Sequence, residues 1–132
     1  METYERYKQA IDNWEFYGTE AYHRISLSGA VVTDGVLWFA ETFEAYWLVD
    51  LVDAIRMRLP GIPFIVADCT VFQNSEGTNE ADVKFTDGND NRVCKDVHVN
   101  MTDLPEGTYS LWIANYPGDQ VGSKVIYLST EH

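Results

Sequence analysis

Hydrophobic residues near the N-terminus recur with the period of an α-helix. They are Tyr4, Tyr7, Ile11 and Trp14, with charged residues between them. This spacing predicts an amphipathic helix that ends near Gly18. The short Ala-Val-Val segment at 30–32 follows, and it predicts a brief strand.

A longer helical pattern runs from Val36 to Leu59. Asp34 precedes this pattern as the expected N-cap, because its carboxylate can accept a hydrogen bond from a free backbone N–H. Pro60 ends the pattern, since proline cannot continue a helix. Glu44 would project from the apolar arc of one continuous helix, so we expect a kink or a break near this residue.

From residue 64 onward hydrophobic and polar residues alternate, which is the period of a β-strand. Turn-forming segments separate the runs, most clearly Asp-Gly-Asn-Asp-Asn at 87–91. The strands expected are 64–73, 82–86, 93–99, 109–113 and 124–128. This order predicts a single α+β domain over residues 1–132. Its N-terminal helices, at 1–60, are expected to pack on one face of an antiparallel meander sheet of about five strands, at 61–132.

The charge balance limits the partners that this chain can have. Its 132 residues carry 9 Lys and Arg against 21 Asp and Glu, which gives a net charge of −12. Such a field repels nucleic-acid phosphates and acidic membrane surfaces, and it attracts basic surfaces. We therefore expect no direct binding to nucleic acid or membrane. A basic protein partner is expected instead, unless the acidity only keeps the protein soluble.

Targeting signals and cysteine usage favour a cytoplasmic location. The N-terminus lacks the basic and then apolar pattern of a secretion signal, and no apolar run approaches membrane-spanning length. Two cysteines, Cys69 and Cys94, are too few for a disulfide framework. We expect the chain in the cytoplasm with reduced thiols, or in the host cytoplasm if a phage encodes it.

The residues that commonly carry catalysis form no recognisable constellation. Cys94 and His98 share a strand face, but their separation of two repeats is long for a hydrogen bond. Two cysteines and three scattered histidines do not supply a zinc site. The 87–91 segment copies three ligand positions of an EF-hand loop, but Arg92 stands where that loop needs glycine and His98 where it needs an acid. We predict no enzymatic activity, no metal and no cofactor.

Carboxylates of the second helical pattern offer a two-acid hydrolase as a competing interpretation. They are Glu41, Glu44, Asp50 and Asp53. Glu41 and Glu44 lie three positions apart, so they could converge on one helix face. Asp50 and Asp53 fall with Arg56 on the face opposite the apolar residues. Acidic helix surfaces are common, and a solvated face is the preferred interpretation.

The partner-binding residues that we predict belong mainly to the β-rich half. The acidic ones are Glu76, Glu80, Asp82, Asp87 and Asp90, with Lys84 as the single base among them. Carboxylates spaced along a rigid surface can replace phosphates in a basic groove. Trp112 is the sixth candidate, because strand alternation points it away from Tyr109 and Leu111. An acidic hairpin that is merely solvated, and a Trp112 that a loop or helix covers, remain as alternatives.

Three motifs in the first half resemble those of an uncharacterised family found in bacterial and mobile-element proteins. They are Gly18-Thr19-Glu20 with Tyr22-His23-Arg24, Thr33-Asp34-Gly35-Val36, and Ala45-Tyr46-Trp47-Leu48-Val49-Asp50. The β-rich half with its Asp-Gly-Asn turn is also similar, so the resemblance extends over most of the chain. The loop at 73–79 and the Glu131-His132 end depart from the family pattern. The resemblance implies the fold, and it brings no activity or binding residues.

Charge and resemblance together favour a non-enzymatic acidic binding protein. We expect an inhibitor similar to phage-encoded anti-CRISPR proteins, which would occupy the basic nucleic-acid-binding surface of a target such as a CRISPR effector. Two alternatives remain. A pocket for a small ligand or a reaction, between helices and sheet, would bring together Tyr22, His23, Arg24, Glu41 and Tyr46. A structural module would form a homodimer through an exposed sheet edge or through Trp112.

Overall fold

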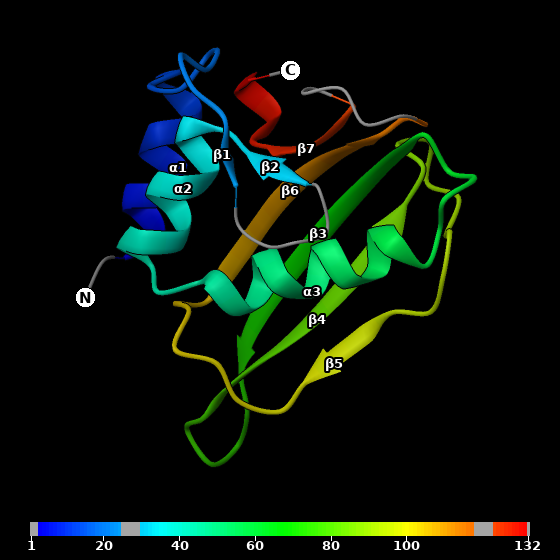
Figure 1. The fold of residues 1–132 in the computed structure, drawn as a ribbon. Coiled ribbons are helices and arrows are strands. Elements are labelled where there is room, and N and C mark those ends of the chain that lie inside the picture. Colours follow the sequence, from blue (N-terminus) through cyan, green and yellow to red (C-terminus); the bar gives the residue numbers. More distant parts are fainter. Residues whose placement is uncertain (1–2, 25–29, 118–122, 132) are drawn as a thin grey trace.

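One sheet with helices layered on one of its faces forms the architecture (Figure 1). The computed structural model describes residues 3–24, 30–117 and 123–131. Within these residues the helices are α1 (Tyr4–Asp12), α2 (Asp34–Thr42), α3 (Tyr46–Met57) and the short 3-10 helix η1 (Ser129–Glu131). The strands are β1 (His23–Arg24), β2 (Val31–Val32), β3 (Phe64–Gln73), β4 (Asn79–Thr86), β5 (Val97–Val99), β6 (Gly107–Asn115) and β7 (Lys124–Tyr127).

The protein is α+β, but the predicted antiparallel meander of about five strands is wrong. The described strands form a seven-stranded sheet in the order β1-β2-β7-β6-β3-β4-β5. This sheet is mixed, because β2 pairs with β7 in parallel and the other neighbours pair in the antiparallel sense. β6 returns to pair with β3 instead of following β5. The order β6-β3-β4-β5 is that of a Greek key, and strand alternation alone cannot distinguish it from a meander.

The connection from β5 to β6 explains this topology. The Thr102 backbone N–H donates to the Asn79 carbonyl at 2.9 Å, and the Asn79 side chain donates to the Leu104 carbonyl at 2.9 Å. Leu104 is 1% exposed, so the crossing segment contributes to the core. These contacts hold the crossing at the start of β4 and bring β6 to the free side of β3.

The separation of α2 from α3 confirms the predicted break near Glu44. This residue has a φ of 53°, in the left-handed region, and the change of direction there ends α2 before α3 begins. The N-cap of α2 is Thr33 and not Asp34, because the Thr33 hydroxyl accepts the Val36 backbone N–H at 3.4 Å. Asp34 is instead the first helical residue, where its charge still suits the positive end of the helix dipole.

The N-terminal helix is shorter than predicted. α1 ends at Asp12, and Trp14 lies beyond it with a φ of 52° and a side chain that is 59% exposed. Tyr7 does face the core: its ring lies 4.8 Å from that of Tyr109, and its hydroxyl accepts the Ser110 backbone N–H at 3.1 Å. The strand predicted at 30–32 is present as β2. β1 was missed, since two residues are too few to show a period.

Alternation along the central strands separates a core face of the sheet from an outer face. The core face carries Ile65, Ala67, Cys69 and Val71 of β3 and Tyr109, Leu111 and Ile113 of β6, all buried. These residues share one hydrophobic cluster with Phe39 of α2 and Leu48 of α3. The helices α1, α2 and α3 therefore cover the core face. The outer face is itself buried at the β7 end, where Val125 and Tyr127 are 6% and 8% exposed, and its part over β3 and β4 is left for other contacts.

Candidate functional site

The outer face of the sheet carries an aromatic group at one end and an acidic group at the other. In the strand register, Trp112 of β6 lies opposite Val66 of β3. Thr70 of β3 lies opposite Asp82 of β4, on the same face as Val66. Four positions along β3 separate the two rows, which corresponds to about 13 Å. The predicted contacts Trp112 and Asp82 therefore face the same side of the molecule.

The acidic group consists of two carboxylates, those of Glu80 and Asp82, with the His98 ring between them. His98 of β5 lies opposite Asp82 in the register, and Glu80 lies two residues before Asp82 on the same face of β4. The His98 Nδ1 atom is 2.7 Å from Asp82 Oδ1, and its Nε2 atom is 2.8 Å from Glu80 Oε1. The hydrogen bond with Asp82 raises the pKa of His98, and the charge of Glu80 acts in the same direction. When His98 loses its proton, its positive charge disappears and the net charge of the cluster becomes more negative by one.

Of the other predicted acids, Asp87 and Asp90 lie apart from this cluster, whereas Glu76 is linked to it through Asn74, whose side-chain amide donates to Glu80 Oε2 at 2.7 Å. Glu76 is in the exposed turn between β3 and β4, where its backbone N–H donates to the Asn74 side chain at 2.9 Å. Asp87 and Asp90 follow the opposite end of β4. β4 has eight residues, so roughly 25 Å separates these two ends. The structure thus brings together Glu80 and Asp82 of the five predicted acids.

The 87–91 segment is a turn built on one aspartate. Asp87 Oδ1 accepts the Asn89 backbone N–H at 2.8 Å, and Asp87 Oδ2 accepts the Asn91 side-chain amide at 3.1 Å. The hydrogen bond from Asn89 lowers the pKa of Asp87 most, followed by that from Asn91. This geometry is that of an Asx-rich turn, the preferred interpretation of the segment.

Trp112 lies in an aromatic row and is partly buried. Its ring centroid is 5.6 Å from that of Phe64 and 6.3 Å from that of Tyr127, both with edge-to-face geometry. Ile126 of β7 and Leu128 after it are fully buried. Trp112 and Phe64 keep part of their surface accessible on the outer face.

The candidate catalytic groups do not form a nucleophile with a base. Burial raises the pKa of the Cys69 thiol to about 12, and burial also raises the pKa of Cys94. Both shifts oppose thiolate formation. Both ring nitrogens of His98 face carboxylates, so neither is directed at Cys94. Among the described residues no group of three or more His, Cys, Asp or Glu is arranged to hold a metal ion.

The two-acid interpretation of the helix is also not supported by the geometry. Asp53 and Arg56 were placed on the polar face, but they are 5% and 3% exposed. Arg56 Nε donates to Asp53 Oδ1 at 2.9 Å within the core. Asn115 of β6 lies beside them and donates from its side chain to the Leu59 carbonyl at 2.9 Å. These residues fasten the end of α3 to the sheet, a role that helical periodicity alone does not reveal.

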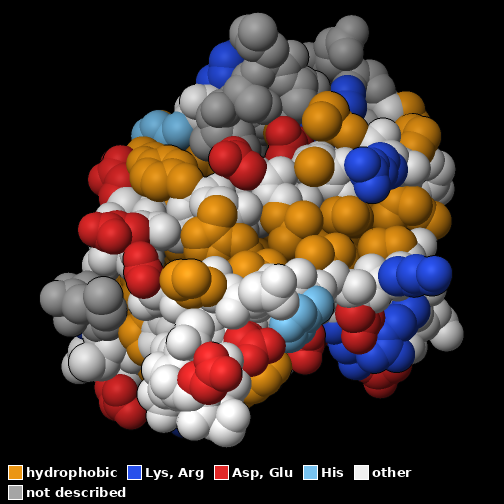
Figure 2. Space-filling model, turned by 90° about the horizontal axis from the view of Figure 1, so that it is seen from below, with side chains coloured by type: hydrophobic (Ala, Val, Ile, Leu, Met, Phe, Trp, Pro, Cys, Tyr) orange, Lys and Arg blue, Asp and Glu red, His pale blue; other side chains and the backbone are white. Residues whose placement is uncertain are grey.

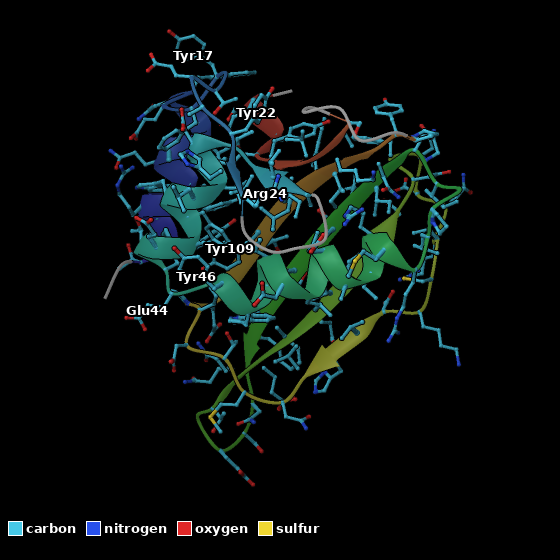
Figure 3. The ribbon with its side chains drawn as sticks, viewed as in Figure 1. Tyr17, Tyr22, Arg24, Glu44, Tyr46 and Tyr109 are labelled. Atoms are coloured by element: carbon cyan, nitrogen blue, oxygen red, sulfur yellow. The ribbon has the colours of Figure 1, made fainter. Side chains whose placement is uncertain are left out.

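The residues of the pocket expected between helices and sheet divide into two groups, and in one of them Glu41 and Tyr46 share a side-chain hydrogen bond. Figure 3 shows Tyr22 and Arg24 apart from Glu44 and Tyr46, which lie toward the start of α3. His23 instead contacts the first residue of α2, with Nε2 2.8 Å from Asp34 Oδ1. Glu41 lies seven positions further along α2, about 10 Å away. His23 and Glu41 therefore lie near opposite ends of α2.

The motif residues of the first half converge on Asp34. Its Oδ2 atom accepts the Glu20 backbone N–H at 2.9 Å, and its own backbone N–H donates to the Thr19 hydroxyl at 3.0 Å. The contact with His23 lowers the pKa of Asp34 most. A surface cleft of about 400 Å³ lies here, lined by residues 15–20 and Asp34. The first two motif segments, at 18–24 and 33–36, are thus parts of one hydrogen-bonded cluster, and the third, at 45–50, lies outside it.

Glu131 completes this cluster and was not predicted. Its carboxylate accepts the Gly35 backbone N–H at 3.1 Å, the Leu128 backbone N–H at 3.0 Å and the Thr33 hydroxyl at 2.5 Å. A carboxylate at a helix N-terminus satisfies free N–H groups and complements the helix dipole. The Glu131 carboxylate therefore already occupies the N-terminus of α2, where an anion would bind.

Comparisons with known proteins bear on the family and not on the function. One protein-family model, described as a family of unknown function, matches residues 9–132. No curated protein and no solved structure matches the chain. The match confirms the resemblance to an uncharacterised family. The bacterial or mobile-element origin and the inhibitor function stay predictions. No helix among the described residues is long and apolar enough to cross a membrane.

Proposed function

The chain belongs to DUF6876, a family of unknown function, and we propose that it is a non-enzymatic domain that binds a basic protein through the outer face of its sheet. The observation that carries this proposal is the position of Glu80, Asp82 and Trp112. All three belong to the face that α1, α2 and α3 leave uncovered. The hydrogen-bonded backbone of the sheet holds such side chains at fixed spacing.

The electrostatics support a basic partner. The net charge of −12 attracts cationic surfaces and speeds their encounter. Asp82 is exposed, and Glu80 is partly exposed beside it. A guanidinium or ammonium group that approaches them would replace His98 as their partner, because His98 is itself exposed and able to turn away. The His98 cluster is therefore a preformed position for a positive charge.

The aromatic row supplies the apolar part of the same surface. Trp112 and Phe64 pack edge to face with part of their surface accessible. Aromatic residues at the centre of an interface carry much of its binding energy. A partner that spans about 13 Å along the strands and about 10 Å across them, from β6 to β4, would touch Trp112 and Asp82 at once.

The finer proposal is that the partner is a nucleic-acid-binding protein. Carboxylates at fixed spacing would then occupy a groove that otherwise takes phosphates, as an anti-CRISPR-like inhibitor does. Such binding excludes the nucleic acid from the groove. Competition between the domain and the nucleic acid for the same groove thus distinguishes this proposal from binding elsewhere on a basic protein.

The test is a capture experiment with charge-matched variants. The tagged domain is used to capture partners from lysate of its source cells, and the affinity of the captured protein is measured at several salt concentrations. The E80K/D82K variant should lose binding. The D12K/D50K variant changes two exposed acids outside this face by the same charge, and it should bind as the wild type does.

Two results would contradict the proposal. One is an equal loss of binding in both variants, which would show that only net charge matters. The other is an affinity that does not fall as the salt concentration rises. If the captured protein binds its nucleic acid and the domain at the same time, the finer proposal of an inhibitor is wrong. The proposal that the outer face binds a basic protein would still stand.

A further inference from the structure

The core is open to solvent along one side, between α3 and the edge strand β5. α3 turns Trp47, Leu51 and Ile55 toward this side, and they are spaced four positions apart. The sheet contributes Val97 and Val99, which lie on its core face, with Val93 and Cys94 before them. All of these side chains are partly exposed. Figure 2 shows the result as a continuous hydrophobic band across this face.

The band is unusual for a surface that remains in water. Scattered exposed hydrophobic residues are common, but a contiguous band points to an interface. It also borders the end of the sheet, since β5 is the last strand in the described order. An unpaired edge strand is a ready position for another chain.

Charges at the ends of the band have a definite polarity. Glu44 precedes α3 and Arg58 follows it, while Lys95 precedes β5 and Asp103 follows it. α3 and β5 run in opposite directions in Figure 1, so the two acids share one end of the band and the two bases share the other. All four side chains are exposed, and within the described residues none of them forms an ion pair.

From this polarity we infer that the band is the interface between two copies of this chain, related by a two-fold axis across the band. Leu51 lies midway between Glu44 and Arg58 in the sequence, and Val99 lies midway between Lys95 and Asp103. An axis through Leu51 and Val99 places each acid opposite a base of the second copy. An axis along the band would instead place acids against acids.

The size and the net charge of the chain are compatible with this dimer. A stable interface of standard size covers roughly 800 Å² on each partner, which is a modest part of the 7380 Å² of accessible surface. Repulsion between two chains of net charge −12 is screened beyond about 8 Å at physiological salt. Apolar burial and the charge pairs at contact distance therefore decide the association. The outer face stays free, so this dimer does not depend on the proposed function.

Sedimentation equilibrium of the purified chain tests the proposal. The wild type should sediment with twice the mass of 15.1 kDa. E44R and R58E are exposed charge reversals that leave the core intact, and each should weaken self-association about tenfold, because two attractive pairs become repulsive. The double variant E44R/R58E should restore it.

A mixture of the two single variants gives the most specific result. E44R carries only bases at its α3 ends and R58E only acids, so they should form a heterodimer more tightly than either forms a homodimer. The matched control pair is E5R and K8E on α1, which lies away from the band and should leave self-association unchanged.

Three results would overturn the proposal. A wild type that stays at 15.1 kDa over the whole concentration range excludes the dimer. A dimer that persists in folded L51D, checked by circular dichroism, places the interface elsewhere. A mixture of E44R and R58E that associates no better than either alone refutes the antiparallel arrangement, and the band would then belong to a different partner.

Discussion

Replacement of Arg56 by methionine tests the packing of α3 most sharply. The Arg56 side chain is 3% exposed and lies 2.8 Å from Asp53, whose side chain is 7% exposed. Its Nη1 atom also donates to the Asn115 side chain at 3.4 Å. Methionine keeps most of the volume and removes the positive charge. The Asp53 carboxylate is then left in the core without the guanidinium.

The expected loss is set by this burial. Removal of one partner from a buried ion pair costs about 3–5 kcal/mol, whereas an exposed pair contributes about 0–1 kcal/mol. With a urea m-value of about 2 kcal/mol/M, the midpoint of unfolding should fall by about 2 M. Equilibrium unfolding in urea, followed by circular dichroism, gives the free energy of unfolding. R24M removes an exposed arginine of β1, outside α3, and should change stability by less than about 0.5 kcal/mol.

A double variant separates loss of the pair from loss of packing. In D53L/R56M both charges are replaced by apolar groups, so most of the stability should return. The reasoning is refuted if R56M costs less than about 1 kcal/mol, as expected for a solvated helix face. It is also refuted if the double variant is no more stable than R56M.

Three further predictions concern single groups. G35A should destabilise the fold by about 1–3 kcal/mol, measured by thermal unfolding. The reason is that a Cβ would lie 2.6 Å from Glu131 Oε1 and 2.8 Å from a Leu128 methyl group. Alanine usually stabilises a helix when it replaces glycine, so a stabilised variant would contradict this prediction. The pKa of His98, measured by nuclear magnetic resonance, should lie above its usual value and fall in D82N. Its contribution to stability is then complete below about pH 6.5 and is lost as the pH rises through the raised pKa, and a pKa at or below about 6.5 would contradict it. The Cys69 thiol, with a pKa of about 12, should react with a thiol reagent at neutral pH only after unfolding, and rapid labelling of the native protein would contradict its burial.

The sequence was sufficient to predict local structure where periodicity is long or a residue conflicts with its neighbours. The ten residues of β3 and the break at Glu44 are examples. It was not sufficient for topology. Whether β6 pairs with β5 or with β3 depends on the contacts of Asn79 and Leu104, which lie far apart in the chain. The two-residue strand β1 has no period at all, and its pairing with β2 comes from tertiary packing.

For the candidate binding residues, strand alternation predicts the face of the sheet and not which side chains lie together. Alternation placed Asp82 and Trp112 on outward positions of their strands, and the structure puts both on the outer face. Proximity in sequence did not translate into proximity in space, since Asp87 and Asp90 lie at the far end of β4. Arg56 was placed in solvent because it is charged. Its burial depends on Asn115, which is 59 positions away in the chain and which no periodic pattern connects to it.

The central claim is that the outer face, and not the total charge, attracts a basic partner. Titration of the isotope-labelled chain with an oligolysine peptide, followed by nuclear magnetic resonance, tests this most directly. The account predicts the largest shifts at Asp82, His98 and the Trp112 indole, with small shifts along α2 and α3. Shifts that are largest at Glu41 and Asp50, or equal around the whole molecule, would contradict it.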